Sequence, residues 1–311
     1  MTPHVSVVIP TFNAGTVLED VLCAVESQDC GDVPGVIAID SGSTDGTLDR
    51  LARHRVTVLT VTPDRFNHGE TRNAALAHVR GDFAVLLVQD AIPASRSWLS
   101  ALIEPLLNDP AVAGSFARQV PAAGASSITT HYLSRWIAAR DQPRMVGPLT
   151  RDEFDRMSPA DRHAICAFDN VCSCIRMGAW RQYPFRKTPI AEDLEWARDV
   201  LLAGCRLAYA PAAVVHHSHE RPIRYELQRT YLVHQRLQEL FGLSTVPTWG
   251  SLVRSVAATV PANARIASRE RAGRTRAVLR GAALGVAMPL GQYLGARSAR
   301  EGRELLRTNG I

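Results

Sequence analysis

Several features that identify common classes of nucleotide-binding and membrane protein are missing from this sequence. It has no GxGxxG and no GxxxxGK[ST] pattern, which excludes the two Gly-rich loops that most often hold phosphates at a helix. No uninterrupted apolar run reaches about 18 residues, so we expect no membrane-spanning helix. Nothing before Val5 resembles a secretory signal, because residues 1–4 are too few and lack a basic start. We therefore expect a cytoplasmic protein.

Cysteine is present but forms no zinc or redox motif. The chain has six cysteines and no CxxC pair. Cys172 and Cys174 flank one residue, with no histidine or second cysteine pair at zinc spacing. This pattern favours reduced thiols in a core over a metal centre.

Acidic charge is scarce at one end of the chain. Residues 250–311 contain eleven Arg and three acidic residues, a net charge of +8, whereas the whole chain carries +5. The first 249 residues are therefore mildly acidic, which argues against a nucleic-acid groove because such grooves need clustered cations. With 311 residues, 46% hydrophobic and 21% charged, the chain is predicted to fold, as one large domain or as one domain with an appendage.

Short apolar segments alternate with helical periodicity in the first part of the chain. Alternation of this kind with short links predicts a parallel sheet with helices on both faces. The predicted strands are residues 4–10, 36–40, 56–61 and 84–88, and the predicted helices start at Thr16, Leu48 and just before Thr71.

The apolar segment AVLLVQDAIP, residues 84–93, is the strand on which the interpretation depends. Its continuous apolar character is typical of a strand buried on both faces of a parallel sheet. Asp90 follows where this strand leaves the core. Ligands bind at the carboxyl ends of strands in such sheets, so Asp90 is placed to reach a substrate or a cation.

Other polar residues follow the neighbouring strands. Carboxylates that can accept from a base or ribose are mixed there with one guanidinium that can pair with phosphate. Asp40 and Asp45, in DSGSTDGT, could instead only cap the next helix. The residues offered at the strand ends are Thr11, Asn13, Asp40, Asp45, Arg72 and Asp90.

Four phrases in register, VVIPTFNAG, AIDSGSTDGT, GETRNAAL and LLVQDAIP, resemble the family 2 glycosyltransferases of the GT-A fold. FNHGETRN and QDAIP are similar to phrases of the rhamnosyltransferase-like branch. The resemblance continues through CAFDNVCSCIRMGAW, IAEDLEWARDVLLAGCRLAYAP and AVVHHSH, and so covers about the first 220 residues. It implies an α/β fold with a mainly parallel central sheet flanked by helices. The residues after the resemblance ends are predicted to form a helical C-terminal appendage.

The resemblance also implies a domain organisation and a donor site. Residues 1–220 would be the catalytic domain, with a nucleotide-sugar half (1–110) and an acceptor half (111–220), followed by a basic helical region (221–311). Asp40 would be the partner of the base, and Arg72 would contact the diphosphate or form an ion pair with a neighbouring Asp. The implied donor-binding residues are Pro10, Thr11, Asn13, Asp40, Ser43, Asp45, Arg72, Gln89 and Asp90.

The metal motif of the family, DxD, falls on Val88-Gln89-Asp90, so this chain departs from it at the first position. The resemblance implies that Asp90 binds Mg²⁺ or Mn²⁺ together with the substrate diphosphate. His217 matches a histidine that follows a PxAVVxH phrase in the family and would be a second ligand. His219 is a further candidate.

Glu192 and Asp193 stand at the start of a helix predicted over residues 193–202. Acidic residues stabilise a helix N-terminus, which is one sufficient explanation of both. The resemblance implies a functional explanation, in which Asp193, rather than Glu192, is the general base of an inverting transfer. Asn170, Ser173 and His219 are the weaker candidates for contacts with the acceptor, and a buried hydrogen-bonded strand explains Asn170 and Ser173 equally well.

The basic region contains a helix predicted over residues 225–241 and a break at 246–250. From Ser251 onward an Arg-rich helix is expected, and residues 265–280 contribute six Arg and one Glu. An apolar segment follows at 282–296, broken by Gly and by Pro289. This combination suits the surface of an anionic membrane at the inner face of the cell membrane. A solvated helix pair packed on the catalytic body is the alternative.

Together these observations predict a metal-dependent inverting glycosyltransferase with a nucleotide-diphosphate sugar as donor, dTDP-L-rhamnose as the first choice, and a glycan or lipid-linked saccharide as acceptor. A nucleotidyltransferase is one alternative, but PTFNAG lacks the Gly-rich basic loop it needs. A non-catalytic membrane-associated scaffold is the other. The acceptor, the linkage and the oligomeric state are not predicted.

Overall fold

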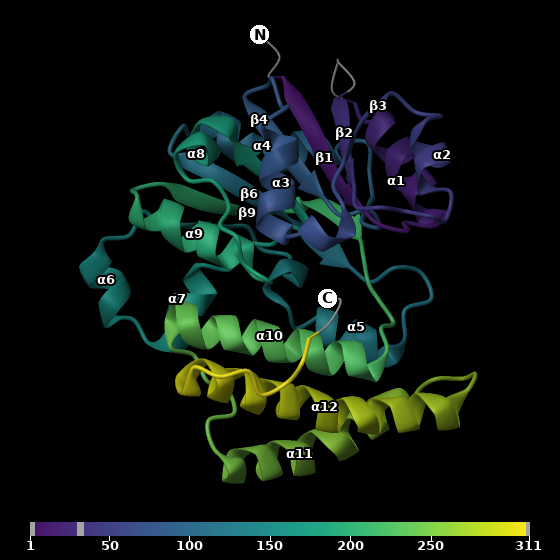
Figure 1. Cartoon of the computed structure of the whole chain (residues 1–311), viewed down its shortest axis with the longest axis vertical. Helices are drawn as coiled ribbons and strands as arrows, with labels where there is room; N and C mark the ends of the chain where they lie inside the picture. The colour runs from purple at the N-terminus through teal and green to yellow at the C-terminus, as the bar shows by residue number, and fades with distance from the viewer. Residues whose placement is uncertain (1–3, 30–33, 309–311) are drawn as a thin grey trace. The chain divides into compact units, whose positions relative to one another are not determined.

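A nine-stranded sheet is the centre of the first of two units into which the chain divides in a computed structural model, which describes residues 4–29 and 34–308 (Figure 1). This unit contains the described residues up to Val120, together with residues 136–156 and 166–217. Its strands are β1 (Val5–Thr11), β2 (Gly35–Asp40), β3 (Val56–Thr60), β4 (Phe83–Leu87), β5 (Ile92–Pro93), β6 (Val112–Val120), β7 (Arg144–Val146), β8 (Cys172–Arg176) and β9 (Arg206–His216).

The strand order is β3-β2-β1-β4-β8-β6-β9-β5, with β7 also paired to β9. Strands β1, β2, β3, β4, β6 and β9 run in one direction, and β5, β7 and β8 run against them. The predictions for the first four strands are confirmed to within one residue. β4 is buried along its whole length, as its continuous apolar sequence indicates.

Helices cover both faces of this sheet. Val7, Ile9, Val85 and Leu87 pack with α1 and α4 in one apolar cluster. Because successive strand side chains alternate between faces, the residues between them point to the opposite face, where α3 packs on β1 and β2. The helices of this unit are α1 (Val17–Glu26), α2 (Thr47–Leu51), α3 (His68–Leu76), α4 (Trp98–Asn108), α6 (Arg151–Arg156), α8 (Met177–Gln182) and α9 (Glu192–Leu202).

Strand β9 contains Pro211, a residue that usually ends or bends a strand, and nevertheless continues to His216. Pro211 lacks the N–H that a regular ladder needs, and the pairing with β6 jumps from Ala210 to Val214 to accommodate it. The continuation carries His216 and the following His217 to the edge where β6 also ends.

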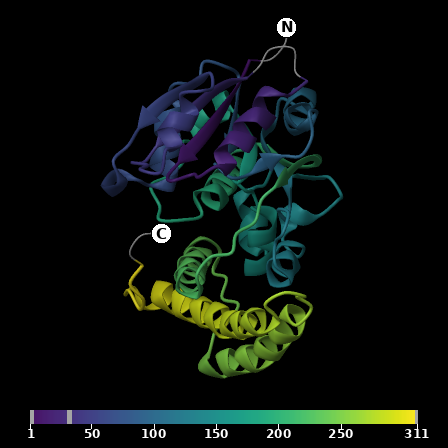
Figure 2. The ribbon, with the colours of Figure 1, turned by 90° about the vertical axis from the view of Figure 1, so that its right-hand side faces the viewer.

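The second unit is helical and contains residues 121–135, 157–165 and the described residues from Ser218 on. Figures 1 and 2 show α12 lying between α10 and α11. Among the described residues, no helix has both the length and the apolar character needed to cross a membrane. The helices of this unit are α5 (Ser127–Leu133), α7 (Pro159–Ile165), α10 (Ile223–Phe241), α11 (Trp249–Ala267) and α12 (Arg274–Glu301).

Helix α12 shows that the predicted interruption by Gly and Pro289 was wrong, because it runs unbroken through both. Pro289 cannot donate to the carbonyl of Gly285, and that carbonyl instead accepts from the Thr259 hydroxyl of α11 at 2.6 Å. Gly295 lies so close to the carbonyl of Tyr231 in α10 that a Cβ atom would collide with it. The Arg-rich stretch 265–280 covers the end of α11 at Ala267 and the start of α12 at Arg274.

Candidate active site

The ends of six strands meet at one edge of the sheet. β1, β2, β4, β6 and β9 all finish there, and the antiparallel β8 begins there, with Cys172 paired to Leu87. The loops that follow these strands therefore bring together groups from positions 11 to 217. This is the edge at which open α/β sheets bind their ligands.

Two of these loops are held to each other by side chains. Asn13 Oδ1 accepts from the Thr44 N–H at 2.8 Å, and the Asn13 N–H donates to Ser43 Oγ at 2.8 Å. The Gly15 N–H donates to Asp45 Oδ2 at 2.8 Å. Hydrogen bonds from the Thr47 hydroxyl and from backbone N–H groups hold the pKa of Asp45 below its usual range. The loop after Pro10 and the loop after Asp40 thus form one rigid rim.

Asp40 is the anchor of this rim. Its side chain is buried, and Oδ1 accepts from the hydroxyls of Thr11 at 2.9 Å and Ser43 at 2.5 Å. Oδ2 accepts from the N–H groups of Gly42 at 3.0 Å and Ser43 at 2.9 Å. These four bonds use the usual accepting capacity of a carboxylate. The assignment of Asp40 to the base stays a prediction, and it requires one of these bonds to open.

Gln89 binds the backbone of Phe12. Its Oε1 accepts from the Phe12 N–H at 2.7 Å and its Nε2 donates to the Phe12 carbonyl at 3.1 Å. An amide can both accept and donate, which an ionised carboxylate cannot do. Gln89 therefore fixes the loop that presents the half-exposed Phe12 ring, a positioning role that sequence reasoning did not find.

Asp90 and His217 lie together, with His217 Nε2 3.6 Å from Asp90 Oδ1. Their oxygen and nitrogen atoms form a donor set that suits Mn²⁺ or Mg²⁺, completed by substrate oxygens or water. The predicted pairing of these two residues is thus compatible with their geometry. His219 belongs to the second unit, and its assignment as a further metal ligand or acceptor contact stays a prediction.

The orientation of His217 is set by Gln119. Gln119 Nε2 donates to Asp169 Oδ2 at 2.7 Å, which leaves its carbonyl oxygen facing His217 Nδ1 at 3.1 Å. An acceptor at that place requires the hydrogen on Nδ1, so in the neutral imidazole the lone pair is on Nε2, the nitrogen that faces Asp90. Asp169 Oδ2 also accepts from Trp136 Nε1 at 2.9 Å. Sequence reasoning missed the role of Gln119 and Asp169, because no spacing along the chain connects them to His217.

A second acidic group lies where α9 begins. Ala191, just before it, has a left-handed backbone with φ 62°, which is uncommon for a residue with a side chain. The Asn170 N–H donates to Asp193 Oδ2 and its side-chain amide donates to Glu192 Oε1, each at 3.3 Å. Ser173 is fully buried and donates to Asn170 Oδ1 at 2.9 Å. Asn170 and Ser173 therefore support the two carboxylates, and their contact with an acceptor stays a prediction.

The two neighbouring carboxylates differ in charge state. Burial, the Glu192 charge and the Asp169 charge together raise the pKa of Asp193 to about 8. Burial disfavours the charged form of Glu192 too, but the Arg72 guanidinium and His68 hold its pKa below the usual range. Near neutral pH, Glu192 is a fixed anion and Asp193 can exchange a proton.

Arg72 forms the ion pair that sequence reasoning gave as an alternative to a diphosphate contact, although the partner is Glu192 and not an Asp. Arg72 Nη1 lies 2.8 Å from Glu192 Oε1, and both side chains are buried. Nη1 also donates to the His68 carbonyl at 3.2 Å. The pair ties α3 to the start of α9 and so positions the residue next to Asp193.

We expect Arg72→Met to lower the free energy of unfolding by about 3–5 kcal/mol, because it leaves the Glu192 carboxylate buried without its counter-ion. Urea unfolding of the variant measures this loss. Arg72→Met combined with Glu192→Gln removes both charges and should recover most of it. A double variant as unstable as the single one would contradict the ion-pair explanation.

Comparison with known proteins agrees with this geometry. The sequence model described as glycosyl transferase family 2 matches residues 6–165. The O-antigen chain rhamnosyltransferase WbaN of Salmonella anatum is 30% identical over 237 residues, 74% of this chain and 70% of that protein. The O-antigen chain rhamnosyltransferase RfbN of Salmonella typhimurium LT2 is also 30% identical, over 73% of this chain and 70% of its own length.

Two solved structures have similar folds. The mannosyltransferase PcManGT from Pyrobaculum calidifontis, in complex with GDP-Man and Mn²⁺, superposes with a TM-score of 0.62 at 19% identity, covering 98% of this chain and 89% of that one. Glucosyl-3-phosphoglycerate synthase from Mycobacterium tuberculosis, in complex with Mn²⁺, UDP and phosphoglyceric acid, gives 0.54 at 21% identity, covering 80% and 81%. These likenesses confirm the expected fold, with its mainly parallel sheet and helical C-terminal region.

Proposed function

The chain belongs to glycosyltransferase family 2, and from this premise we propose that it transfers L-rhamnose from dTDP-L-rhamnose to a glycan or lipid-linked saccharide of the cell surface, with inversion. The observation that carries the choice of sugar is the 30% identity, over most of both chains, to two O-antigen chain rhamnosyltransferases. The match extends well beyond residue 165, where the family model ends, since it spans 237 residues.

Asp193 is the general base in the proposed mechanism. Its carboxylate takes the proton of the acceptor hydroxyl while that oxygen forms a bond to the anomeric carbon. The bond from the anomeric carbon to the diphosphate breaks on the opposite side, and the nucleoside diphosphate leaves with the electron pair. The raised pKa of Asp193 supports this role, because a base with a pKa near the working pH can both accept and release the proton.

Asp90 and His217 would hold the divalent cation, Mg²⁺ or Mn²⁺, in this proposal. When bound, the cation neutralises charge on the departing diphosphate. Gln89 and the rim formed by Asn13, Ser43 and Asp45 would position the nucleoside end of the donor. Glu192 stays paired with Arg72 and keeps the base in place.

Incubation with dTDP-L-rhamnose, GDP-mannose and UDP-glucose, each with Mg²⁺ or Mn²⁺, tests this proposal. We expect binding and slow hydrolysis of dTDP-L-rhamnose above the other two. Preference for another donor would overturn the sugar but leave the transferase. Turnover of a nucleoside triphosphate with a sugar phosphate, releasing pyrophosphate, would favour the nucleotidyltransferase, and no donor binding at all would favour the scaffold.

The helical second unit supports a peripheral position at an anionic membrane as part of the proposed function. Trp249, Val253 and Leu279 are 66%, 53% and 66% exposed on α11 and α12. Exposed arginines lie on the same two helices and on the segment that joins them: Arg254, Arg265, Arg269, Arg271, Arg274 and Arg276. Exposed apolar side chains beside cationic ones are the combination that binds anionic headgroups.

Replacing Arg271, Arg274 and Arg276 by Glu should weaken binding to phosphatidylglycerol-containing vesicles by about 10²-fold or more, since each basic residue near the headgroups contributes about 1 kcal/mol. Vesicle sedimentation measures the change. Arg55→Glu, Arg80→Glu and Arg181→Glu make the same charge change on exposed positions of the first unit and serve as the control. Equal binding by both triple variants would contradict the assignment.

A further inference from the structure

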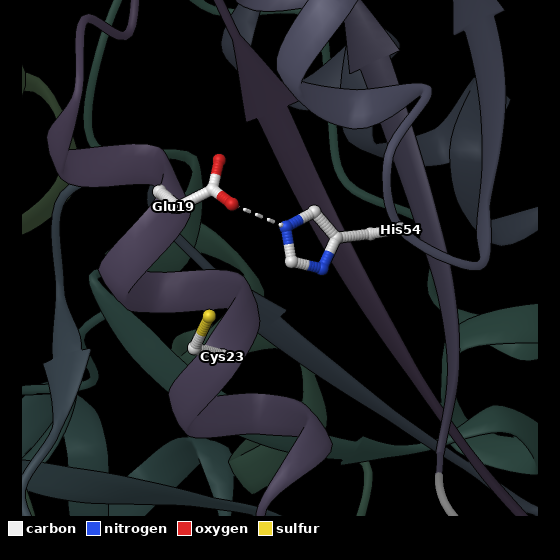
Figure 3. A group of neighbouring side chains, drawn as sticks. All are labelled: Glu19, Cys23 and His54. Carbon is white, nitrogen blue, oxygen red and sulfur yellow. Dashed lines mark hydrogen bonds and ion pairs between the residues drawn. The ribbon is translucent and has the colours of Figure 1, made fainter.

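A group of possible metal ligands lies on α1, apart from the candidate active site. Glu19, Cys23 and Glu26 are spaced by four and three residues on this helix, so they share one of its faces. His54, from the segment between α2 and β3, faces them. Figure 3 shows Glu19, Cys23 and His54 together. The imidazole of His54 faces the side of α1 that carries Glu19 and Cys23.

The imidazole of His54 is held at both nitrogens. Nε2 lies 3.1 Å from Glu19 Oε1, and Nδ1 lies 3.0 Å from Glu26 Oε1. Its side chain is only 8% exposed, whereas the two glutamates and Cys23 are accessible to solvent. One ligand atom each from Glu19, Cys23 and His54 falls within 4.8 Å of the other two. Bond lengths of about 2.0–2.3 Å at tetrahedral angles place zinc ligands about 3–4 Å apart, so small side-chain rotations suffice.

We propose that Glu19, Cys23 and His54 form a Zn²⁺ site, with water as the fourth ligand. The metal is bound by a Glu19 oxygen, the Cys23 thiolate and His54 Nε2. Glu26 is the positioning residue, since its carboxylate accepts the hydrogen of Nδ1 and so directs the lone pair of Nε2 to the metal. A carboxylate behind a zinc-bound histidine is a recurrent arrangement. A thiolate and an imidazole favour Zn²⁺ over Mg²⁺ or Mn²⁺.

Proton balance and charge are consistent with such a site. Binding displaces the thiol proton of Cys23 and the proton that an imidazolium carries on Nε2, and both pass to solvent. The two glutamates supply negative charge for the cation and its bound groups. Without metal, the same histidine would only bridge the two carboxylates, so metal binding must be measured directly.

The position of the group separates it from the transfer reaction. His54 comes just before β3 begins, and therefore lies towards the amino ends of the parallel strands, whereas Asp90 and His217 follow strand carboxyl ends. A zinc ion here would cross-link α1 to the segment between α2 and β3. Its effect would be on the stability of the N-terminal part of the sheet.

Cobalt substitution tests the site in the full-length, untagged, metal-stripped protein. We expect one equivalent of Co²⁺ to give a thiolate-to-cobalt charge-transfer band that Zn²⁺ abolishes by competition. The band should be absent from Cys23→Ser and present in Cys205→Ser, the matched change at another thiol, and in Asp90→Asn. No band in the wild type, or an unchanged band in Cys23→Ser, would overturn the proposal.

Thermal unfolding with Zn²⁺ alone gives an independent readout. Zinc at about 100 times its dissociation constant should raise the melting temperature of the wild type, and Cys23→Ser should lose this rise while its metal-free melting temperature stays close to that of the wild type. Glu26→Gln, which keeps all three ligands, should bind zinc about 10–100-fold more weakly. Equal zinc-induced shifts in wild type and Cys23→Ser would overturn the site, and unchanged affinity in Glu26→Gln would overturn the role of Glu26.

Discussion

Asp193→Asn is expected to lower the rate of sugar transfer about 10²–10⁴-fold, the usual range for loss of a general base. The amide keeps an oxygen that can accept from the Leu194 N–H, as Oδ1 of Asp193 does at 2.8 Å, and loses only the longer contact of Oδ2 with the Asn170 N–H at 3.3 Å. It cannot take the proton of the acceptor hydroxyl. Donor binding, measured by titration with dTDP-L-rhamnose, should change little, because the variant affects the acceptor side of the reaction.

Asp199→Asn is the matched control for this variant. It makes the same chemical change on the same helix, at a carboxylate that pairs with Arg186 at 2.8 Å. We expect near wild-type rates from it. An unchanged transfer rate in Asp193→Asn would remove Asp193 as the base, and Glu192→Gln would then be the next variant to measure.

The pH dependence of the wild type follows from the same group. Burial, together with the charges of Glu192 and Asp169, raises the pKa of Asp193 to about 8, so most of the base carries a proton at neutral pH. The rate of transfer should therefore rise with pH and level off above about pH 8. A rate profile that is flat between about pH 6 and pH 9 would contradict this assignment.

Ionisation of Asp193 with rising pH, which should increase the transfer rate, should decrease the stability of the folded protein. The folded protein keeps a proton that the unfolded chain releases near the ordinary pKa of 3.8, so this residue costs stability increasingly from about pH 4 up to about pH 8. Asp193→Asn removes that cost. Its melting temperature should exceed that of the wild type at pH 8, and the difference should vanish towards pH 4. A lower melting temperature at pH 8 would contradict the raised pKa of Asp193.

Local sequence patterns were sufficient for the first half of the sheet. The apolar segments that became β1, β2, β3 and β4 are short and bounded by turn residues, so their limits could be predicted to within one residue. The helix that carries Asp193 could be predicted for the same reason, from acidic residues followed by apolar residues at helical spacing.

Contacts between distant segments could not be predicted from such patterns. Gln119 meets His217 only because β6 and β9 pair in parallel and end together, 98 residues apart in the chain. Pro289 looked like a helix breaker, since nothing next to it in sequence shows that Thr259 would satisfy the Gly285 carbonyl. The departure at Val88-Gln89-Asp90 likewise gained a physical meaning only from the hydrogen bonds of Gln89 to Phe12.

Loss of the Asp90–His217 pair is the second change for which we expect a large effect. Asp90→Asn and His217→Gln should each weaken Mn²⁺ binding on the order of 100-fold, because Val88 replaces the first carboxylate of the family's DxD motif and cannot act as a ligand in their place. When Mn²⁺ is limiting, the transfer rate should fall in proportion. Electron paramagnetic resonance of free Mn²⁺ measures binding without reliance on turnover. His216→Gln changes the adjacent, exposed histidine and is the matched control.

Gln119→Leu separates the orientation of His217 from its presence. Leucine cannot accept the hydrogen on His217 Nδ1, so the imidazole loses the contact that directs its Nε2 lone pair to Asp90, and Mn²⁺ affinity should fall about 10–100-fold with both ligands retained. If His217→Gln weakens binding and Gln119→Leu does not, the two ligands stand and the orienting role of Gln119 is wrong. If His216→Gln and His217→Gln weaken it equally, the assignment of His217 itself is wrong.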